Sequence, residues 1–255
     1  MSYSSLEPTE NSSEGQVDFI STNIFGMYGV SDKINLRVRL PYIWRKNKSN
    51  GSTETVSGIG DINFGLRTII SNKIVGPGNK VFLDASIYIP TADSFSENPL
   101  DEDMDMDMGN ESHDDFAMGT GQYSAALGLE YWMRSEFPWV IGVSGELRQP
   151  LNTSDGGFKP GRKMRVDLHL IRQKAIIKQI HPYIKFSLRH ADKNQWDGEK
   201  SPNSGGVYLD GFAQMDFELN ERASLILSAG LPIWEDINGS QLRGISGSVS
   251  LRVTK

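Results

Sequence analysis

The chain has 255 residues, a mean hydropathy of −0.39 and no cysteine, so disulfides and thiolate metal sites are excluded. No segment approaches the roughly 20 unbroken apolar residues of a membrane-spanning helix, and no block of basic residues indicates a nucleic-acid partner. The net charge of −6 is concentrated locally. Ten acidic and no basic residues lie between Asp93 and Asp115, so the rest of the chain carries about +4.

The N-terminal residues MSYSSLEPTENSSEGQ have neither the charged segment nor the apolar segment of a secretory signal. We expect residues 1–16 to be the remnant of an outer loop or a disordered N-terminus. Nothing after them resembles a linker between two cores, so residues 17–255 are expected to form one domain, with a long acidic loop at 91–120.

Apolar and polar residues alternate in eleven segments, which predicts β-strands because side chains alternate between the two faces of a strand. No helix is predicted. Most segments have about 9 to 13 residues, longer than the usual five or six of a soluble strand and typical of a tilted membrane-spanning one. The strands are expected at residues 17–28, 33–44, 59–70, 80–90, 121–133, 138–149, 163–173, 182–191, 206–219, 222–234 and 242–254.

The connections between these strands alternate in length. Most links at one end are short, such as GVSDK and NER, whereas those at the other end are longer and polar, such as RKNKSNGSTETVSG and the acidic segment. Short turns on one rim and long loops on the other are typical of outer-membrane β-barrels, in which the long loops face the outside. We therefore predict an all-β, antiparallel, up-and-down transmembrane barrel.

Proline marks the strands that run toward the long loops. Four of these five strands are expected to end at Pro41, Pro90, Pro150 and Pro232. Proline lacks the N–H group that a sheet needs, so it suits the place where strand pairing stops.

The strand count adds one expectation. With the long loops outside, the strand at 17–28 runs inward, whereas barrels of this kind have an even number of strands and termini on the inner side. We expect about 12 strands in the full protein, 11 of them recognisable here, with the missing outward strand and a leader upstream of Met1.

A soluble β-sandwich is the alternative fold. It predicts that Ile62, Phe64 and Leu66 are buried by protein, whereas a membrane barrel exposes them in a continuous apolar belt.

Four stretches of the sequence are similar to a known family. YGVSDKINLRVRLPYIW, SGIGDINFGLRT, YIPTADS and GTGQYSAALGLEYW resemble a family of outer-membrane channels associated with the meta-cleavage pathway of phenol degradation. The Gly58–Asp61 motif and the Pro90–Asp93 run are its most specific parts. The resemblance implies an outer-membrane barrel that passes aromatic or other hydrophobic molecules, and it implies no catalytic residues.

If the apolar strand faces meet lipid, the charged faces line the lumen. They either select solutes at a constriction or pair with one another and brace a filled wall. The candidate residues are Arg37, Arg39, Asp61, Arg67, Asp84, Glu130, Glu146, Arg148, Arg165, Asp167, His169, Lys185, Arg189, Asp210, Asp216 and Glu218.

The acidic loop DEDMDMDMGNESHDD partly matches a calcium-binding loop. The match fails where the geometry is strict, because Met108 occupies the position that requires glycine. Methionines and His113 offer copper ligands instead, and a solvated acidic loop that meets divalent cations loosely is the third reading. The weak metal candidates are Asp103, Asp105, Asp107, His113 and Asp114.

A nucleophilic enzyme would need a serine, a histidine and a third group in contact. His113, His169, His181 and His190 are available, but none has a recognisable serine motif, so we expect no enzyme activity.

The sequence thus predicts a channel or passive transporter of an outer membrane for small molecules, hydrophobic or aromatic ones included. Its expected partners are the lipid bilayer and the solute. No cofactor is expected beyond a weakly bound divalent cation, and the oligomeric state is open. The alternative is a closed surface barrel whose acidic loop binds cations.

Overall fold

The computed structural model describes residues 1–8, 16–49, 52–71, 79–92, 118–134, 138–154, 157–176, 179–238 and 241–254. Every regular element in these residues is a strand, and none of them forms a helix that could cross a membrane. The strands are β1 (Ser2–Pro8), β2 (Gln16–Gly29), β3 (Ile34–Ser49), β4 (Ser52–Ile59), β5 (Ile62–Ser71), β6 (Asn79–Ile89), β7 (Ser124–Arg134), β8 (Trp139–Pro150), β9 (Phe158–Lys159), β10 (Lys163–Arg172), β11 (Ile180–Ala191), β12 (Gln195–Trp196), β13 (Glu199–Lys200), β14 (Gly206–Asn220), β15 (Ala223–Ile237), β16 (Gln241–Arg243) and β17 (Ser246–Val253).

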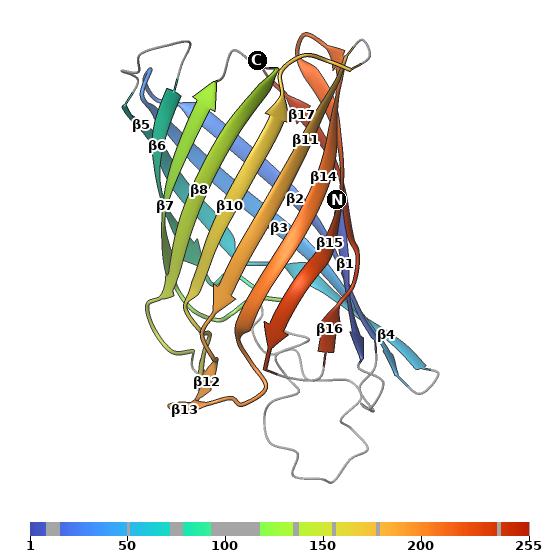
Figure 1. Ribbon diagram of the computed structural model, residues 1–255. Helices are drawn as coiled ribbons and strands as arrows, with labels where there is room; N and C mark the ends of the chain where they lie inside the picture. Colours follow the sequence, from blue (N-terminus) through green and yellow to red (C-terminus); the bar gives the residue numbers. More distant parts are fainter. Residues whose placement is uncertain are drawn as a thin grey trace.

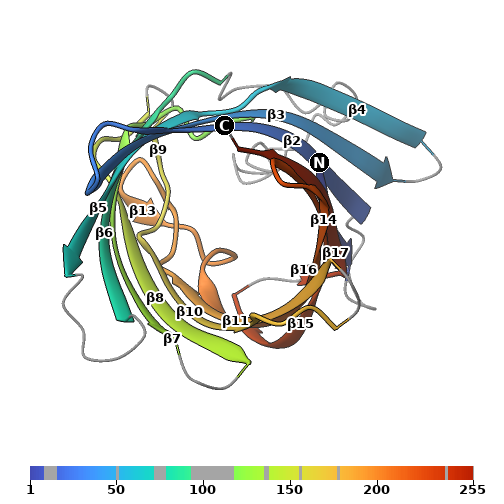
Figure 2. The ribbon, with the colours of Figure 1, turned by 90° about the horizontal axis from the view of Figure 1, so that it is seen from above.

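Fourteen of these strands form one antiparallel sheet that closes into a barrel (Figures 1 and 2). Most strands that follow one another along the chain are neighbours in the sheet, and β1 closes the ring by pairing with β2 on one side and with β16 and β17 on the other. β4 and β5 together occupy one place around the barrel, and so do β16 and β17. The fourteen strands therefore fill twelve strand positions. β9, β12 and β13 form a separate small sheet at the rim that carries the long connections.

All eleven predicted strands are present, but the expectation for the N-terminus is wrong in one respect. Residues 2–8, expected to be loop or disordered, form β1 and supply the twelfth position, which we expected upstream of Met1. Residues 9–15 lie outside the described part of the chain. The strand escaped prediction because SYSSLEP is short and rich in serine, so its alternation is weak.

The connection RKNKSNGSTETVSG was also expected to be a loop and is largely a hairpin. β3 continues to Ser49 and pairs with β4 as far as Ser52, so the two strands project beyond the barrel wall (Figure 1). An Asn-Gly dipeptide between two strands is a strong hairpin signal, and residues 50 and 51 provide it here.

The prolines mark irregular pairing rather than simple strand ends. Pro90 follows β6 and Pro150 ends β8, as expected. Pro41 instead lies inside β3, where the strand changes partner from β5 to β4. Pro232 lies inside β15, beside a shift in its register with β14. In both places the ladder is interrupted, so the missing N–H is tolerated.

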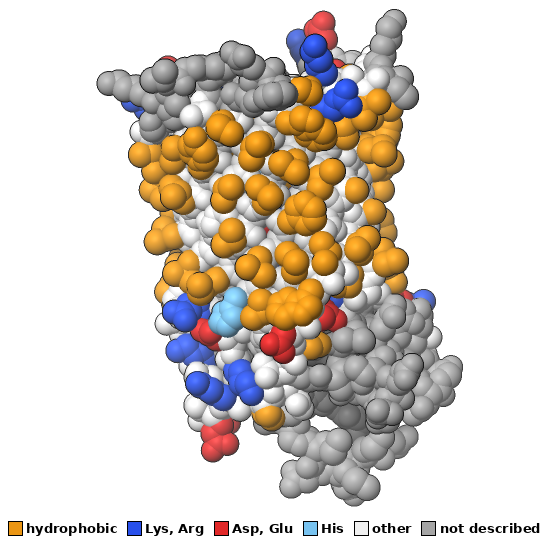
Figure 3. All heavy atoms as spheres, in the orientation of Figure 1, with side chains coloured by type: hydrophobic (Ala, Val, Ile, Leu, Met, Phe, Trp, Pro, Cys, Tyr) orange, Lys and Arg blue, Asp and Glu red, His pale blue; other side chains and the backbone are white. Residues whose placement is uncertain are grey.

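The outer face of the barrel is an apolar belt. Figure 3 shows hydrophobic side chains over the middle of the visible face and charged ones near its two ends. Phe64 is 47% exposed and Leu66 is 38% exposed, whereas the buried hydrophobic residues of the described chain are only Met118, Ala126 and Phe158. A soluble sandwich needs an apolar core, so this fold is excluded. A closed barrel with such a belt satisfies its backbone hydrogen bonds within lipid.

Candidate functional site: the charged lumen

The strand register places the predicted lumen residues that lie in strands on the face opposite the belt, whereas Asp61 lies between β4 and β5 and has no strand partner. Arg37 pairs across the sheet with Gly65, which neighbours Ser86, and the same face continues around the barrel through successive partners. Directly paired residues share a face, so these side chains lie together on the inner face, and their role in selecting solutes stays a prediction. What the sequence could not assign is how the charges pair.

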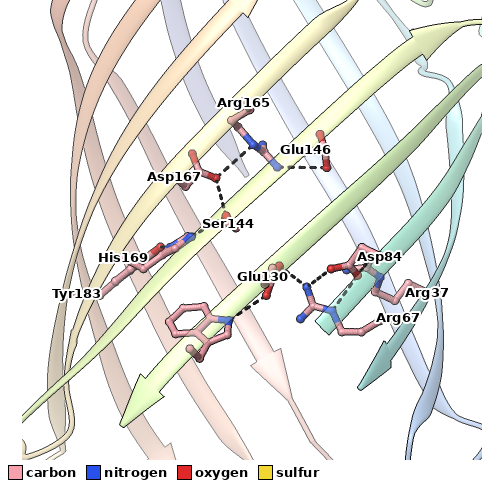
Figure 4. Close-up of polar contacts among 11 residues, drawn as sticks. Arg37, Arg67, Asp84, Glu130, Ser144, Glu146, Arg165, Asp167, His169 and Tyr183 are labelled. Carbon is pink, nitrogen blue, oxygen red and sulfur yellow. Dashed lines mark hydrogen bonds and ion pairs between the residues drawn. The ribbon is translucent and has the colours of Figure 1, made fainter. Parts of the chain in front are cut away.

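A compact ion network lies on the wall formed by β3, β5, β6 and β7 (Figure 4). Arg67 contacts both carboxylate oxygens of Asp84, at 2.9 and 3.0 Å, and also bonds Glu130. Arg37 reaches Asp84 at 2.5 Å from the other side, and Trp132 Nε1 donates to Glu130 at 3.0 Å. Two arginines and two carboxylates thus neutralise one another, as a wall with a rigid inner surface requires.

A second group centres on Arg165 of β10. Its guanidinium group lies 3.3 Å from Glu146 and 3.2 Å from Asp167. The two carboxylates differ in environment, because the Asp167 side chain is 5% exposed and the Glu146 side chain is 34% exposed. Arg165 is therefore held by the buried Asp167, whereas its other partner, Glu146, is open to the lumen.

Next to Asp167, a chain of hydrogen bonds links four side chains. Ser144 Oγ donates to Asp167 Oδ2 at 3.5 Å, Ser144 Oγ lies 3.0 Å from His169 Nε2, and His169 Nδ1 lies 2.6 Å from the hydroxyl of Tyr183. If Ser144 donates to Asp167, Nε2 of His169 donates to Ser144 and the Tyr183 hydroxyl donates to Nδ1. With that tautomer His169 does not accept the serine proton, as a catalytic base must.

A third group occupies the part of the lumen nearest the long connections. Arg189 of β11 and Arg243 of β16 both bond Asp210, the latter at 2.8 Å, and Arg243 Nε also bonds Glu235 at 3.1 Å. The guanidinium carbon of Arg243 lies 4.4 Å from the centre of the Tyr208 ring, a cation–π contact.

The remaining predicted residues make single contacts. Arg148 stacks on Tyr88 at 3.6 Å from the ring centre, and Lys185 lies 4.3 Å from the centre of the Phe212 ring. Arg39 Nε donates to the side chain of Asn23 at 2.8 Å. Nearer the short-turn rim, Asp216 pairs with Arg252 at 2.5 Å, and Glu218 pairs with His181 at 3.3 Å.

Asp61 has a structural role that the sequence did not predict. Its Oδ2 accepts hydrogen bonds from the N–H and the hydroxyl of Thr120, both at 3.0 Å. Thr91 Oγ1 donates to the carbonyl of Gly60, and the N–H of Gly60 donates to the carbonyl of Pro41. The motifs that carry the family resemblance therefore meet at one point of the outer rim, which explains why they are rich in small residues.

Gly119 shows how closely these segments approach. A Cβ atom there would lie 2.3 Å from Asp61 Oδ1 and 2.4 Å from Ala92 Cβ. Such distances are far below contact, so only glycine fits between the two segments.

We predict that Asp61→Ala loosens residues 118–122. The change leaves the N–H of Thr120 without its acceptor, at a cost of about 1–3 kcal/mol, and amide hydrogen exchange of this segment should accelerate by at least about tenfold. Asp61→Asn is the control, because its amide oxygen still accepts a hydrogen bond and exchange should change much less. Equal exchange in the wild type and in Asp61→Ala would contradict the assignment.

Within the described residues, two adjoining cavities lie along the lumen. The outer cavity has a volume of about 380 Å³ and is lined by Glu146, Arg148, Lys163, Met164, Arg165, Arg189, His190, Ala191, Tyr208 and Arg243. The inner cavity has a volume of about 100 Å³ and is lined by Arg37, Asp84, Ser86, Ala126, Gly128, Glu130, Ser144, Gly145, Glu146 and Arg165. Glu146 and Arg165 line both, so their ion pair stands at the boundary between the cavities.

The weak metal candidates cannot be placed. Asp103, Asp105, Asp107, His113 and Asp114 lie in residues 93–117, outside the described part of the chain. Among the residues that the structure does describe, no group of three or more His, Cys, Asp or Glu side chains could hold a metal ion.

Several lumen residues were missed by sequence reasoning. Arg243 lies in the three-residue β16, Glu235 follows the register shift of β15, and Ser144 and Tyr183 are uncharged. The alternation itself would have found Ser144 and Tyr183, since they share their faces with Glu146 and Lys185. No local signal marks Arg243.

No protein-family model matches the chain, and no curated protein matches it in sequence. Solved structures do match its fold. The crystal structure of an outer membrane channel from Pseudomonas putida F1 is similar with a TM-score of 0.71 at 11% identity, over 99% of this chain and 93% of that one. The β domain of the Bordetella autotransporter BrkA is similar with a TM-score of 0.57 at 13% identity, over 100% of this chain and 97% of that one.

The fold, the belt and these likenesses lead to one conclusion. The sheet is closed, its exposed face is apolar and its polar face is turned inward, which is the arrangement of barrels that span the outer membrane. The protein is an integral outer-membrane β-barrel of twelve strand positions.

Proposed function

We propose that the protein is a passive channel for small solutes. The observation that carries the proposal is the pair of adjoining cavities, which share Glu146 and Arg165 and together extend from the outer part of the lumen to the ion network of Arg67 and Asp84. A solute entering from the long-loop side would pass the Glu146–Arg165 pair, whose side chains are 34% and 44% exposed. These two residues are the proposed constriction.

Aromatic solutes are part of the proposal, in line with the family that the sequence resembles. The inner face carries several rings beside the charges, among them Tyr88, Trp132, Tyr183 and Phe212. Such rings stack on flat apolar solutes, whereas the guanidinium groups bind polar substituents. The lumen thus suits small molecules that combine a ring with a polar group better than long alkyl chains.

We propose no enzymatic role for the Ser144–His169 pair. β8 pairs with β7 on one side and with β10 on the other, so the N–H groups around Ser144 are used in the sheet. An acyl-transfer site needs free donors where the oxyanion develops, and it needs a histidine that accepts the serine proton. Here the pair connects Asp167 to Tyr183 through hydrogen bonds and has a structural role.

Planar bilayers test the channel directly. The refolded protein should give discrete conductance steps in potassium chloride. Ala126→Phe should lower the conductance by about half or more, because Ala126 lines the inner cavity and a phenyl ring fills much of about 100 Å³. Ala125→Phe places the same ring on the opposite face of the strand, toward lipid, and should leave the conductance unchanged.

The folded state of each variant is verified by resistance of the barrel to unfolding in detergent at room temperature. If the folded wild-type barrel gives neither conductance nor solute flux into vesicles, the channel proposal is wrong. If Ala125→Phe and Ala126→Phe lower the conductance equally, the path does not run through the inner cavity.

A further inference from the structure

The lining of the outer cavity has an excess of positive charge. Five basic side chains, from β8, β10, β11 and β16, line it together with a single carboxylate, Glu146. They are Arg148, Lys163, Arg165, Arg189 and Arg243. Asp167, Asp210 and Glu235 pair with Arg165, Arg189 and Arg243, so the positive excess is smaller than the lining alone indicates. It still favours anions over cations in the cavity.

Two guanidinium nitrogens of this cavity lack acceptors. Nε of Arg189 and Nη2 of Arg243 are buried, yet neither has a hydrogen-bond partner among the described residues. Their other nitrogens are held by Asp210 and Glu235, so the orientation of both side chains is fixed. A buried charged donor without an acceptor is costly. Both atoms have almost no accessible surface, so an anion in the cavity meets the exposed parts of Arg189 and Arg243, whose side chains are 43% and 20% exposed, and stabilises their charge.

Arg148 differs from the other arginines of the cavity. It makes no ion pair with any residue that the structure describes, and it is held instead by stacking on Tyr88 at 3.6 Å. Stacking fixes the plane of the guanidinium group while leaving its N–H edge available for hydrogen bonds. This edge is the geometry that binds a carboxylate with two parallel hydrogen bonds.

We propose that the outer cavity binds the carboxylate group of a small organic anion through Arg148, Arg189 and Arg243. That such an anion is the solute carried rests on the proposed channel, whereas the binding itself does not. The volume of about 380 Å³ lies near the lower end of the usual range of small-molecule sites. It suits a molecule of the size of benzoate rather than a peptide or an oligosaccharide.

Binding is measured without flux, by saturation-transfer NMR of benzoate on the folded full chain in detergent micelles. Benzamide is the matched neutral probe, because it has the same ring and nearly the same volume. Benzoate should bind at least about tenfold more tightly than benzamide. Arg148→Gln should weaken benzoate binding by about fivefold or more, and Arg148→Lys, which keeps the charge but loses the planar fork, should weaken it by about two- to fivefold.

Arg252→Gln is the control for charge. Arg252 also lies in the lumen, but it pairs with Asp216 and Ser224, away from the outer cavity. It should leave benzoate binding unchanged. If Arg252→Gln and Arg148→Gln weaken binding equally, the effect is one of overall charge and the proposed site is wrong.

Other outcomes also overturn the site. Equal affinities for benzamide and benzoate would refute a carboxylate site. Displacement of benzoate by inorganic phosphate at a lower concentration than benzoate itself requires would refute it as well. Conductance separates the two proposals. If the barrel binds benzoate but conducts nothing, the site is supported and the channel proposal is wrong. If the barrel conducts but binds benzoate no more tightly than benzamide, the channel is supported and the site is wrong.

Discussion

Leu129→Arg is expected to destabilise the barrel by about 2–4 kcal/mol, the cost of an arginine that faces lipid near the middle of the bilayer. Leu129 is the central residue of β7 and is 52% exposed on the belt. The measurement is the free energy of unfolding in urea, with the protein folded into phospholipid vesicles. A loss of this size is a large part of the free energy of unfolding of a typical protein, so the folded fraction should fall measurably.

Leu219→Arg is the matched control for depth. Leu219 is 55% exposed, but it lies next to the last residue of β14, close to the short-turn rim. The same substitution near the interface costs only about 0–1 kcal/mol. Equal costs at the two positions, or a negligible cost at Leu129, would show that the belt does not face lipid.

The strands and their faces could be predicted because alternation is a local signal. Ile34, Leu36 and Val38 lie on one face and Arg37 and Arg39 on the other, and no distant residue changes that assignment. A single slip of register would turn every charge toward lipid, so the pattern specifies both the fold and the direction in which each side chain points. β1 lacked such a pattern, and its position depends on β2 and β17 at opposite ends of the chain.

The ion pairs could not be predicted because they cross between strands. Arg37 of β3 meets Asp84 of β6, which is two strand positions away, with the glycine at position 65 between them. Arg243 meets Asp210 across β15 in the same way. Both contacts need small residues or bends on the intervening strand, and these depend on register and rotamers that a single sequence does not reveal.

The motif residues show a second limit of sequence reasoning. Asp61 was assigned to the lumen because it alternates with Asn63, but it lies between β4 and β5, outside both strands. Its charge serves Thr120, which is 59 residues further along the chain. A carboxylate beside several glycines at a strand end can therefore be a structural anchor at the rim. The sequence pattern alone does not distinguish this role from solute selection.

Asp84→Asn is expected to have the largest effect on the lumen. Asp84 bonds both Arg37 and Arg67, and its side chain is only 13% exposed. Removing one partner of a buried ion pair costs about 3–5 kcal/mol. The two arginines are 21% and 23% exposed to the lumen, so the cost is smaller here. We expect the free energy of unfolding, measured in vesicles, to fall by about 2 kcal/mol.

The same change should alter ion selectivity. Asparagine leaves Arg37 and Arg67 with only Glu130, so the inner cavity gains one positive charge. A unit charge about 7 Å from the path in water contributes about 0.6 kcal/mol, or about threefold in the local concentration of an anion. The reversal potential in a potassium chloride gradient should therefore shift toward that of chloride.

Asp216→Asn makes the same chemical change at a weaker pair. Asp216 pairs with Arg252, whose side chain is 53% exposed, so the loss should be below about 1 kcal/mol. If Asp84→Asn costs no more than Asp216→Asn, the network of Arg37, Arg67 and Asp84 does not brace the wall. If it costs more but leaves the reversal potential unchanged, the network braces the wall and ions do not pass beside it, which would place the conducting path elsewhere in the lumen.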